Sequence, residues 1–320
     1  MNTKRVLIGT RASELAIWQA EFVKKIIKRQ YPQLDINLKL IKTEGDKVLD
    51  TSLDKIEGKG LFTKELENEL LAGEIDMAVH SLKDLPTDLP TGLVLGAITE
   101  RQSVEDVIVA KEKRMSIRKL PKKAVIATGS LRRQAQVRYF RKDISILDLR
   151  GNIQTRIKKY LESNWDAIIL AKAGLERLGM EEYISGVLET REMLPAVGQG
   201  ALGVEIRQDD AFVKELLKKV NHLNTEIEIK AERAFLKRLG GGCKTPIAAY
   251  AKLKKNTMGQ IILLIDGLVA TTDGKNYFRS TISGSPDNPE KVGINLAESI
   301  LKMGAKKIIK EVRKNYQLQR

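Results

Sequence analysis

The stretch AVIATGSLRRQAQVRYF, residues 124–140, contains the pattern that decides the fold. Four apolar residues predict a short buried strand, Thr-Gly-Ser predicts a turn, and the remainder predicts a helix. The same order of strand, turn and helix begins with the apolar runs at 5–9, 144–149 and 166–171. Strands that alternate with helices form mainly parallel sheets with helices on both faces, so we expect an α/β fold.

Arginine residues follow the ends of several of these expected strands. In such sheets, ligands bind beyond the carboxyl ends of the strands, where helix N-termini present free N–H groups to anions. The arginines concerned are Arg11, Arg132, Arg133, Arg150, Arg156 and Arg177. Hydroxyls and exposed amides nearby come from Thr10, Ser13, Thr128, Gly129 and Ser130. Each arginine could instead pair with a local acid, but six in equivalent places favour a small polyanionic ligand, and the planar guanidinium suits carboxylates.

The overall charge is compatible with such a ligand. The 320 residues include 56 Lys and Arg against 41 Asp and Glu, which gives a net charge of +15 and a pI near 9.6. A chain of this length predicts about two or three domains. A nucleic-acid-binding protein would need interleaved aromatic residues or a known binding module, whereas aromatic residues make up only 5% and no such module is found in the sequence.

The chain offers few residues for disulfide or metal chemistry. Its one cysteine, Cys243, excludes an internal disulfide and suits a reducing compartment. Its two histidines, His80 and His222, cannot assemble the usual zinc ligand sets. The N-terminus lacks the apolar run of a signal peptide, and no stretch reaches the roughly 18 apolar residues of a membrane span. We therefore expect a cytoplasmic protein with no metal site and no membrane association.

The segment IDMAVHSLKDLPT, residues 75–87, places charged residues at the end of a further strand. Lys83 and Asp84 follow the apolar run, and Pro86 stops it. An acid at the mouth of a parallel strand is well placed to act on a bound ligand, although a surface ion pair between these two side chains would give the same pattern. His80 lies inside the apolar run, where a histidine bonded within the core is a better interpretation than a catalytic base.

Two glycine-rich segments approach nucleotide-binding motifs without matching them. In GKGLFT, residues 58–63, a threonine replaces the last glycine of a dinucleotide fingerprint, so a mobile lid that carries Lys59 is favoured. GGGCKT, residues 240–245, lacks the glycine that a P-loop needs before Lys-Thr, and it follows an expected helix rather than a strand. We expect that helix to begin with a capping box formed by Thr225 and Glu228.

Seven motifs occur together and in order: GTRASELAIWQA, KGLFTKELE, AVHSLKDLPT, GSLRRQAQ, LRGNIQTR, LPAVGQGALGVE and GGCKTPIAAY. In these motifs the chain resembles the porphobilinogen deaminase family, also called the hydroxymethylbilane synthases, from about residue 4 to 312. The resemblance implies a transferase of tetrapyrrole and heme biosynthesis that joins four porphobilinogen molecules head to tail, releases ammonia at each step and frees 1-hydroxymethylbilane by hydrolysis. It also implies that the product grows on a dipyrromethane cofactor attached to Cys243 by a thioether. The glycines before Cys243 would let the loop present its sulfur to so bulky a group.

The resemblance further implies roles for individual residues. Asp84 matches the family's catalytic aspartate, and Gln199 matches a glutamine with a supporting role. The residues that match the carboxylate-binding set are Arg11, Ser13, Lys83, Thr128, Ser130, Arg132, Arg133, Arg150, Arg156 and Arg177. The lid would contain Lys55, Lys59 and Phe62. Leu7 stands where many members carry arginine, so one carboxylate contact would have to be supplied differently.

The implied fold consists of two periplasmic-binding-protein-like α/β lobes with mainly parallel sheets around a cleft, plus a smaller α+β C-terminal domain with a three-stranded sheet. The expected boundaries are 1–99 with 200–219 for domain 1, 100–199 for domain 2 and 220–320 for domain 3, which carries Cys243. The resemblance implies a monomer that binds porphobilinogen and the growing linear polypyrrole, with no nucleic-acid partner and no metal or nucleotide cofactor. A non-enzymatic two-lobed binding or sensing protein for a polycarboxylate metabolite is the alternative. It would explain the arginines but would need neither Cys243 nor Asp84.

Overall fold

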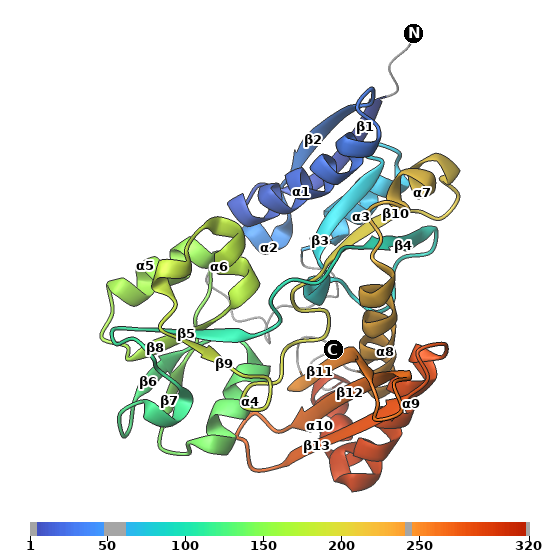
Figure 1. Cartoon of the computed structure of the whole chain (residues 1–320). Helices are drawn as coiled ribbons and strands as arrows, with labels where there is room; N and C mark the ends of the chain where they lie inside the picture. The colour runs from blue at the N-terminus through green and yellow to red at the C-terminus, as the bar shows by residue number, and fades with distance from the viewer. Residues whose placement is uncertain (1–4, 48–61, 241–244, 318–320) are drawn as a thin grey trace. The chain divides into compact units, whose positions relative to one another are not determined.

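The computed structural model describes residues 5–47, 62–240 and 245–317 (Figure 1). These residues form two compact units. The first unit comprises residues 5–47, 62–102 and 200–226, and the second comprises residues 103–199 and 227–317.

A five-stranded sheet of order β2-β1-β3-β10-β4 forms the centre of the first unit. Strand β1 runs parallel to β2 and β3, whereas β10 runs antiparallel to β3 and β4, so the sheet is mainly parallel with one reversed strand. The strands are β1 (Arg5–Arg11), β2 (Asp35–Ile41), β3 (Met77–Ser81), β4 (Leu93–Ile98) and β10 (Leu202–Arg207). The helices are α1 (Glu14–Gln30), α2 (Glu44–Lys47), α3 (Lys64–Leu71), the 3-10 helix η1 (Leu82–Asp84) and α7 (Ala211–Leu217).

The junction between β1 and α1 shows how the sequence builds this unit. Ser13 caps α1, because its hydroxyl accepts a hydrogen bond from the backbone N–H of Ala16 at 3.4 Å. Helix α1 then buries Val23 and Ile27, four residues apart on one face, against the sheet. Because only two residues separate the strand from the helix, Arg11 ends β1 beside the N-terminus of α1.

The second unit contains another five-stranded sheet, of order β7-β6-β8-β5-β9. Strands β6, β7 and β8 are parallel, and β5 runs antiparallel to both of its neighbours. The strands are β5 (Asp106–Ala110), β6 (Val125–Ala127), β7 (Ser145–Leu147), β8 (Ala167–Ala171) and β9 (Gly186–Leu188). The helices are η2 (Ile117–Lys119), α4 (Leu131–Phe140), α5 (Ile153–Leu161), α6 (Lys172–Leu178) and η3 (Glu181–Tyr183). The strand, turn and helix predicted for residues 124–140 are therefore confirmed.

Helices cover both faces of this second sheet. In β8, Ile168 and Leu170 pack in one cluster with Ile157 of α5. Ile169, which lies between them in sequence, packs in a different cluster with Val137 of α4. Since successive residues of a strand point to opposite faces, a fully apolar strand is what a sheet covered on both sides requires.

The C-terminal part of the second unit is an α+β arrangement around the antiparallel sheet β11-β12-β13. Its elements are α8 (Leu223–Leu239), whose first four residues belong to the first unit, β11 (Ile247–Lys255), β12 (Ile261–Ala270), β13 (Tyr277–Gly284), α9 (Pro289–Ile300), the π-type segment η4 (Leu301–Ala305) and α10 (Lys306–Gln317). A kink at Gly304, which has a φ of 124°, separates α9 from α10. Two α/β lobes with mainly parallel sheets and a small C-terminal α+β region confirm the expected fold class.

The capping box predicted for α8 is wrong. The helix begins at Leu223, two residues before Thr225, and the Nδ1 atom of His222 accepts the backbone N–H of Thr225 at 3.3 Å. The side chain of Glu228 accepts the backbone N–H of Leu253 at 3.0 Å instead of closing a box. The hydrogen-bond acceptor at this helix start is therefore a histidine, and histidine is not among the residues preferred at the N-cap.

Acidic side chains of α8 bind the outer edge of β11. Besides the bond from Leu253 to Glu228, the backbone N–H of Ala251 donates to Oε1 of Glu232 at 2.8 Å. The other oxygen of Glu232 accepts the N–H of Gly198 at 2.8 Å. Glu232 is completely buried, and these backbone donors compensate the burial of its polar atoms.

The three-stranded sheet is joined to the second lobe by polar and aromatic contacts. Arg279 of β13 donates to the carbonyl oxygens of Arg191 at 2.8 Å and Thr190 at 3.0 Å. The rings of Tyr139 in α4 and Tyr277 in β13 stack with their centroids 3.8 Å apart. These contacts explain why the C-terminal region and the second lobe form one compact unit.

Candidate active site

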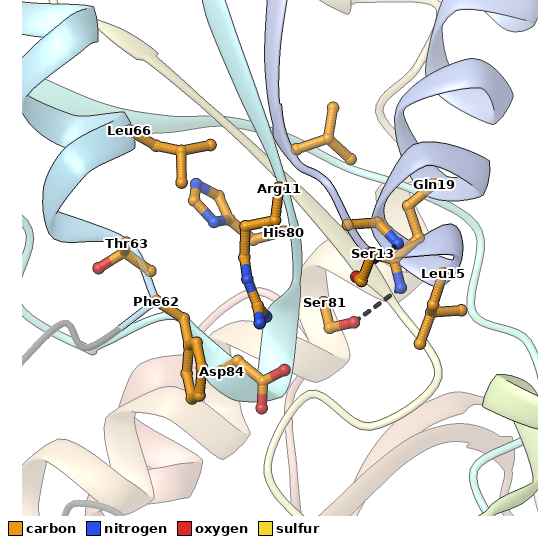
Figure 2. Close-up of a pocket in the computed structure, with 12 residues that line it drawn as sticks. Arg11, Ser13, Leu15, Gln19, Phe62, Thr63, Leu66, His80, Ser81 and Asp84 are labelled. Carbon is orange, nitrogen blue, oxygen red and sulfur yellow. Dashed lines mark hydrogen bonds between the residues drawn. The ribbon is translucent and has the colours of Figure 1, made fainter. Parts of the chain in front are cut away.

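The first unit contains a pocket at the carboxyl ends of β1 and β3 (Figure 2). It is lined by Arg11, Ser13, Leu15, Ala16, Gln19, Phe62, Thr63, Leu66, Val79, His80, Ser81 and Asp84. Four of the predicted site residues, Arg11, Ser13, Phe62 and Asp84, are therefore brought together. Within the lining, Nε2 of Gln19 donates to Oγ of Ser81 at 2.8 Å.

Arg11 is held from two sides. Its Nε atom donates to both carboxylate oxygens of Asp46 at 3.2 Å, and its Nη2 atom also binds Oδ1 of Asp46. The guanidinium carbon lies 4.2 Å from the centre of the Phe62 ring, a cation–π contact. Burial raises the pKa of Asp46, but the hydrogen bonds from Arg11 and Thr43 outweigh this effect and hold the pKa below its ordinary value.

Asp84 reaches the pocket because the chain turns directly after β3. The 3-10 helix η1 begins at Leu82, and the backbone N–H of Leu85 closes it on the carbonyl of Leu82 at 3.2 Å. Asp84 is the last residue of η1 and lines the pocket with an exposed side chain. Lys83 precedes it in η1 and is half-buried. The arrangement leaves the Asp84 carboxylate accessible to a ligand in the pocket.

His80 forms the wall of the pocket rather than a free base. Its Nε2 atom lies 3.0 Å from Oε2 of Glu205, and both side chains are buried. The prediction of a histidine bonded within the core is confirmed. Glu67 of α3 adds a third titratable group, and burial together with the charge of Glu205 raises the pKa of Glu67.

In the second unit, Arg132 and Arg133 converge on Asp106. Nη2 of Arg133 and Nη1 of Arg132 each lie 2.7 Å from a carboxylate oxygen of Asp106. Arg133 also donates from Nη1 to the carbonyl of Ile169 at 2.7 Å, and Arg132 donates to the carbonyl of Leu194 at 2.7 Å. Helix α4 begins at the end of β6, so its first turn carries both arginines into the lobe.

This cluster is buried and ionised. Asp106 is completely buried, and Arg132 and Arg133 are 7% and 4% exposed. Burial raises the pKa of Asp106, but the charges of Arg132 and Arg133 prevail and hold it well below its ordinary value. Gln199 completes the group, since its Nε2 atom donates to Oδ1 of Asp106 at 3.1 Å and to the carbonyl of Val104 at 2.7 Å.

The other predicted arginines of this unit have different surroundings. Arg150 follows β7 and pairs with the half-exposed Asp148 at 3.2 Å. Arg156 lies in the first turn of α5, where its Nε atom donates to the carbonyl of Gly151 at 2.7 Å. Arg177 is buried in the last turn of α6, and burial lowers its pKa to about 10. Arg177 therefore does not lie at a strand end, although it keeps its charge at neutral pH.

The two predicted hydroxyl residues of this unit organise the start of α4. Oγ of Ser130 accepts the backbone N–H of Arg133 at 3.4 Å and so caps the helix. Oγ1 of Thr128 accepts the N–H of Ser130 at 3.3 Å. Both side chains belong to the turn between β6 and α4, where a helix N-terminus offers free N–H groups.

Three predicted residues, Lys55, Lys59 and Cys243, lie outside the described residues. Leu7, which replaces a family arginine, is half-buried and packs in an apolar cluster with Ile41 and Leu66. The departure at this position therefore contributes apolar packing in place of a charge.

The sequence did not identify Asp46 and Asp106, which hold the predicted arginines. Asp106 opens the apolar strand β5, and an acid at the start of an apolar run was an available signal. Asp46 lies in the four-residue helix α2, where no periodic pattern distinguishes it. The pairing of both acids with arginines could not be predicted, because the partners are distant in sequence.

Among residues 5–47, 62–240 and 245–317, no group of three or more His, Cys, Asp and Glu side chains could hold a metal ion. In the same part of the chain, no helix is long and apolar enough to cross a membrane.

Two family models match the chain. Residues 6–215 match the model described as porphobilinogen deaminase, dipyromethane cofactor binding domain, and residues 226–302 match porphobilinogen deaminase, C-terminal domain. A porphobilinogen deaminase from Chlorobium limicola is 49% identical over 311 residues, which cover 97% of this chain and 99% of that protein. One from Carboxydothermus hydrogenoformans is 49% identical over 312 residues, 98% of each chain.

Solved structures of periplasmic proteins are similar at a much lower level. A TRAP periplasmic solute binding protein from Desulfovibrio salexigens has a TM-score of 0.42 and 10% identity, over 70% of this chain and 73% of that chain. A probable amino-acid ABC transporter extracellular-binding protein from Bacillus subtilis has a TM-score of 0.42 and 11% identity, over 68% of this chain and 90% of that chain.

Proposed function

The chain belongs to the porphobilinogen deaminase family, and on that premise we propose that this enzyme joins four porphobilinogen molecules head to tail on a covalently bound dipyrromethane primer. Hydrolysis then releases 1-hydroxymethylbilane. The observation that carries the proposal is the pocket in which the guanidinium of Arg11, the hydroxyl of Ser13 and the carboxylate of Asp84 come together. A polycarboxylate-binding protein without activity would have no use for the exposed acid among these cationic and hydroxyl groups.

The donors of the site fit a pyrrole ligand. Each pyrrole unit of the substrate carries an acetate and a propionate, and guanidinium, hydroxyl and helix N-terminal groups are suited to carboxylates. We assign carboxylate binding to Arg11, Ser13, Lys83, Thr128, Ser130, Arg132, Arg133, Arg150, Arg156 and Arg177. When bound, the dipyrromethane supplies the free pyrrole α-carbon to which the first substrate is joined.

Arg132 and Arg133 retain donors for this purpose. A guanidinium has five N–H groups, and the bonds to Asp106 and to backbone carbonyls use only some of them. Asp106 and Gln199 would then fix the planes of the two side chains. A fixed guanidinium loses less side-chain freedom when it binds a carboxylate.

Asp84 is proposed to act on the substrate's positive charge. Loss of ammonia from the aminomethyl group of porphobilinogen leaves a cation delocalised over the pyrrole. A carboxylate that accepts the pyrrole N–H stabilises this charge, and the effect grows as the ligand excludes water from the pocket. The new carbon–carbon bond releases one proton from the attacking α-carbon, and Asp84 can carry that proton away from the ring.

An intact-mass measurement tests the covalent primer. The purified wild-type protein should exceed its sequence mass by two porphobilinogens less two ammonias, which is the mass of an attached dipyrromethane. Cys243 is the only thiol to which a thioether could be formed. The Cys243→Ser variant should show no excess. Incubation with porphobilinogen should then add a ladder of pyrrole units to the wild type alone.

The outcomes separate the two candidate functions. A wild-type mass that stays unchanged throughout the incubation, with no porphobilinogen consumed, would contradict the enzyme hypothesis and favour a binding protein. Excess mass that persists in the serine variant would reject Cys243 as the attachment site. Far-ultraviolet circular dichroism of both proteins serves as the folding control.

We also propose a monomer in the cytoplasm with three domains, 1–99 with 200–219, 100–199 and 220–320. Each of the three sheets falls within one of these ranges, which supports the division. The single cysteine suits a reducing compartment. Gel filtration combined with light scattering measures the oligomeric state directly.

A further inference from the structure

The guanidinium of Arg11 has two distinct edges. Its Nε–H and one Nη2–H form the edge that binds both oxygens of Asp46. Of the remaining three N–H groups, one on Nη1 and one on Nη2 form the second edge at the tip of the side chain, and the other on Nη1 points back toward Cδ. No residue in the described part of the chain bonds to that second edge.

Asp46 is itself fixed in place. Its Oδ2 atom accepts the hydroxyl of Thr43 at 2.8 Å and the backbone N–H of Thr43 at 3.3 Å. Thr43 is completely buried, so the carboxylate is anchored to a side chain inside the unit. The lowered pKa of Asp46 agrees with an ionised group at neutral pH.

Phe62 restrains the same guanidinium from a second direction. The guanidinium carbon lies over its ring, 4.2 Å from the ring centre. The hydrogen bonds to Asp46 and this ring contact restrain Arg11 before any ligand arrives. Figure 2 shows the tip of this side chain pointing into the pocket that Asp84 also lines.

We propose that Asp46 is a positioning residue. It binds the Nε/Nη2 edge of Arg11 and thereby orients the second edge, Nη1/Nη2, toward a carboxylate of the pyrrole ligand. The inference rests on the proposed function, because it needs Arg11 to bind that carboxylate. A guanidinium binds a carboxylate through two parallel hydrogen bonds only when the two groups lie nearly in one plane. An arginine whose guanidinium is already oriented therefore binds the carboxylate more tightly.

A different role for Asp46 predicts the opposite result. Asp46 carries the same charge as the ligand carboxylate and could compete with it for Arg11. Removal of a competitor would tighten binding, whereas removal of a positioning group would weaken it. The sign of the change in KM therefore distinguishes the two roles.

The test compares steady-state kinetics of the cofactor-loaded enzyme and its variants with porphobilinogen. Asp46→Asn should raise KM roughly tenfold, while kcat stays within about twofold of the wild type. In an Arg11→Met background the same substitution should leave KM unchanged, because the group that it positions is absent. A purely structural role of Asp46 would raise KM equally in both backgrounds.

Two further variants keep the test decisive. Asp76→Asn removes a carboxylate that pairs with Arg207 at 3.2 Å in the same unit but does not line the pocket, so KM should not change. If Asp46→Asn fails to fold, Thr43→Val removes one bond to Asp46 in a side chain of similar shape. It should raise KM in the same direction by a smaller factor.

The results also separate this inference from the proposed function. An Arg11→Met variant with normal KM would remove Arg11 from the carboxylate-binding set and overturn the positioning role of Asp46. A wild-type protein that does not turn over porphobilinogen would overturn the proposed function. A raised KM for Arg11→Met with a normal or lowered KM for Asp46→Asn would overturn the positioning role alone.

Discussion

Replacing Asp84 with asparagine should lower kcat about a thousandfold, since removal of a group that stabilises developing charge or transfers a proton costs about two to four powers of ten. Asparagine keeps the size of the side chain and one acceptor oxygen but loses the negative charge. The cation left by the departing ammonia would then face a neutral group. KM should change little, because the carboxylate-binding residues remain in place.

The measurement is turnover of porphobilinogen at saturation, with intact mass used to confirm that each preparation carries the cofactor. Asp209→Asn makes the same chemical change at an exposed position of the first unit outside the pocket lining, and it should keep full activity. A loss in kcat of less than tenfold for Asp84→Asn would reject the electrostatic role. A raised KM at normal kcat would identify Asp84 as a binding group only.

Replacing Asp106 with asparagine should have the largest effect on stability, a loss of about 3–5 kcal/mol. The carboxylate is completely buried between Arg132 and Arg133. Its removal leaves two buried positive charges with no counter-charge between them, and such charges are costly in a medium of low polarity. Denaturant unfolding of the cofactor-loaded protein gives the difference in midpoint.

The contribution of Asp106 to the free energy of unfolding should decrease as the pH is lowered. The pKa of Asp106 is lowered in the folded protein, so its ionised form contributes stability above the unfolded value of about 4 and loses it as pH falls further. The difference between wild type and Asp106→Asn should therefore be full at neutral pH and shrink below about pH 4. Asp143→Asn removes a surface ion pair with Arg141 in the same unit and should barely shift the midpoint. An equally small shift for Asp106→Asn would contradict the buried-cluster interpretation.

Local patterns in the sequence predicted most of the regular structure. Apolar runs followed by small polar turns predicted β1 and β6 with their helices, because burial depends on side chains near in sequence. The strand β8 was also predicted, but the turn expected after it was wrong, since α6 begins directly at Lys172. The reversed strands β5 and β10 did not follow from such patterns, because strand direction depends on pairing between distant segments. The start of α8 was misplaced because His222 replaced a more usual capping residue.

The site was predictable to the extent that a residue's role follows from its own position. Asp84 and Arg11 each end a strand or follow one directly, and this marked them before the structure was known. Their supporting acids were not marked, because Asp46 lies 35 residues from Arg11 and Asp106 lies 27 residues from Arg133. Only the folded chain brings these partners together.

The acids of α8 that bind β11 also affect whether two copies of this protein can associate through the edge of the sheet. A strand at the border of a sheet normally exposes N–H groups that can recruit a strand from a neighbouring molecule, which is a first step toward aggregation. Glu228 and Glu232 occupy the donors of Leu253 and Ala251 on this border. An incoming strand would have to displace two hydrogen-bonded carboxylates, so this side of the sheet resists growth into larger assemblies.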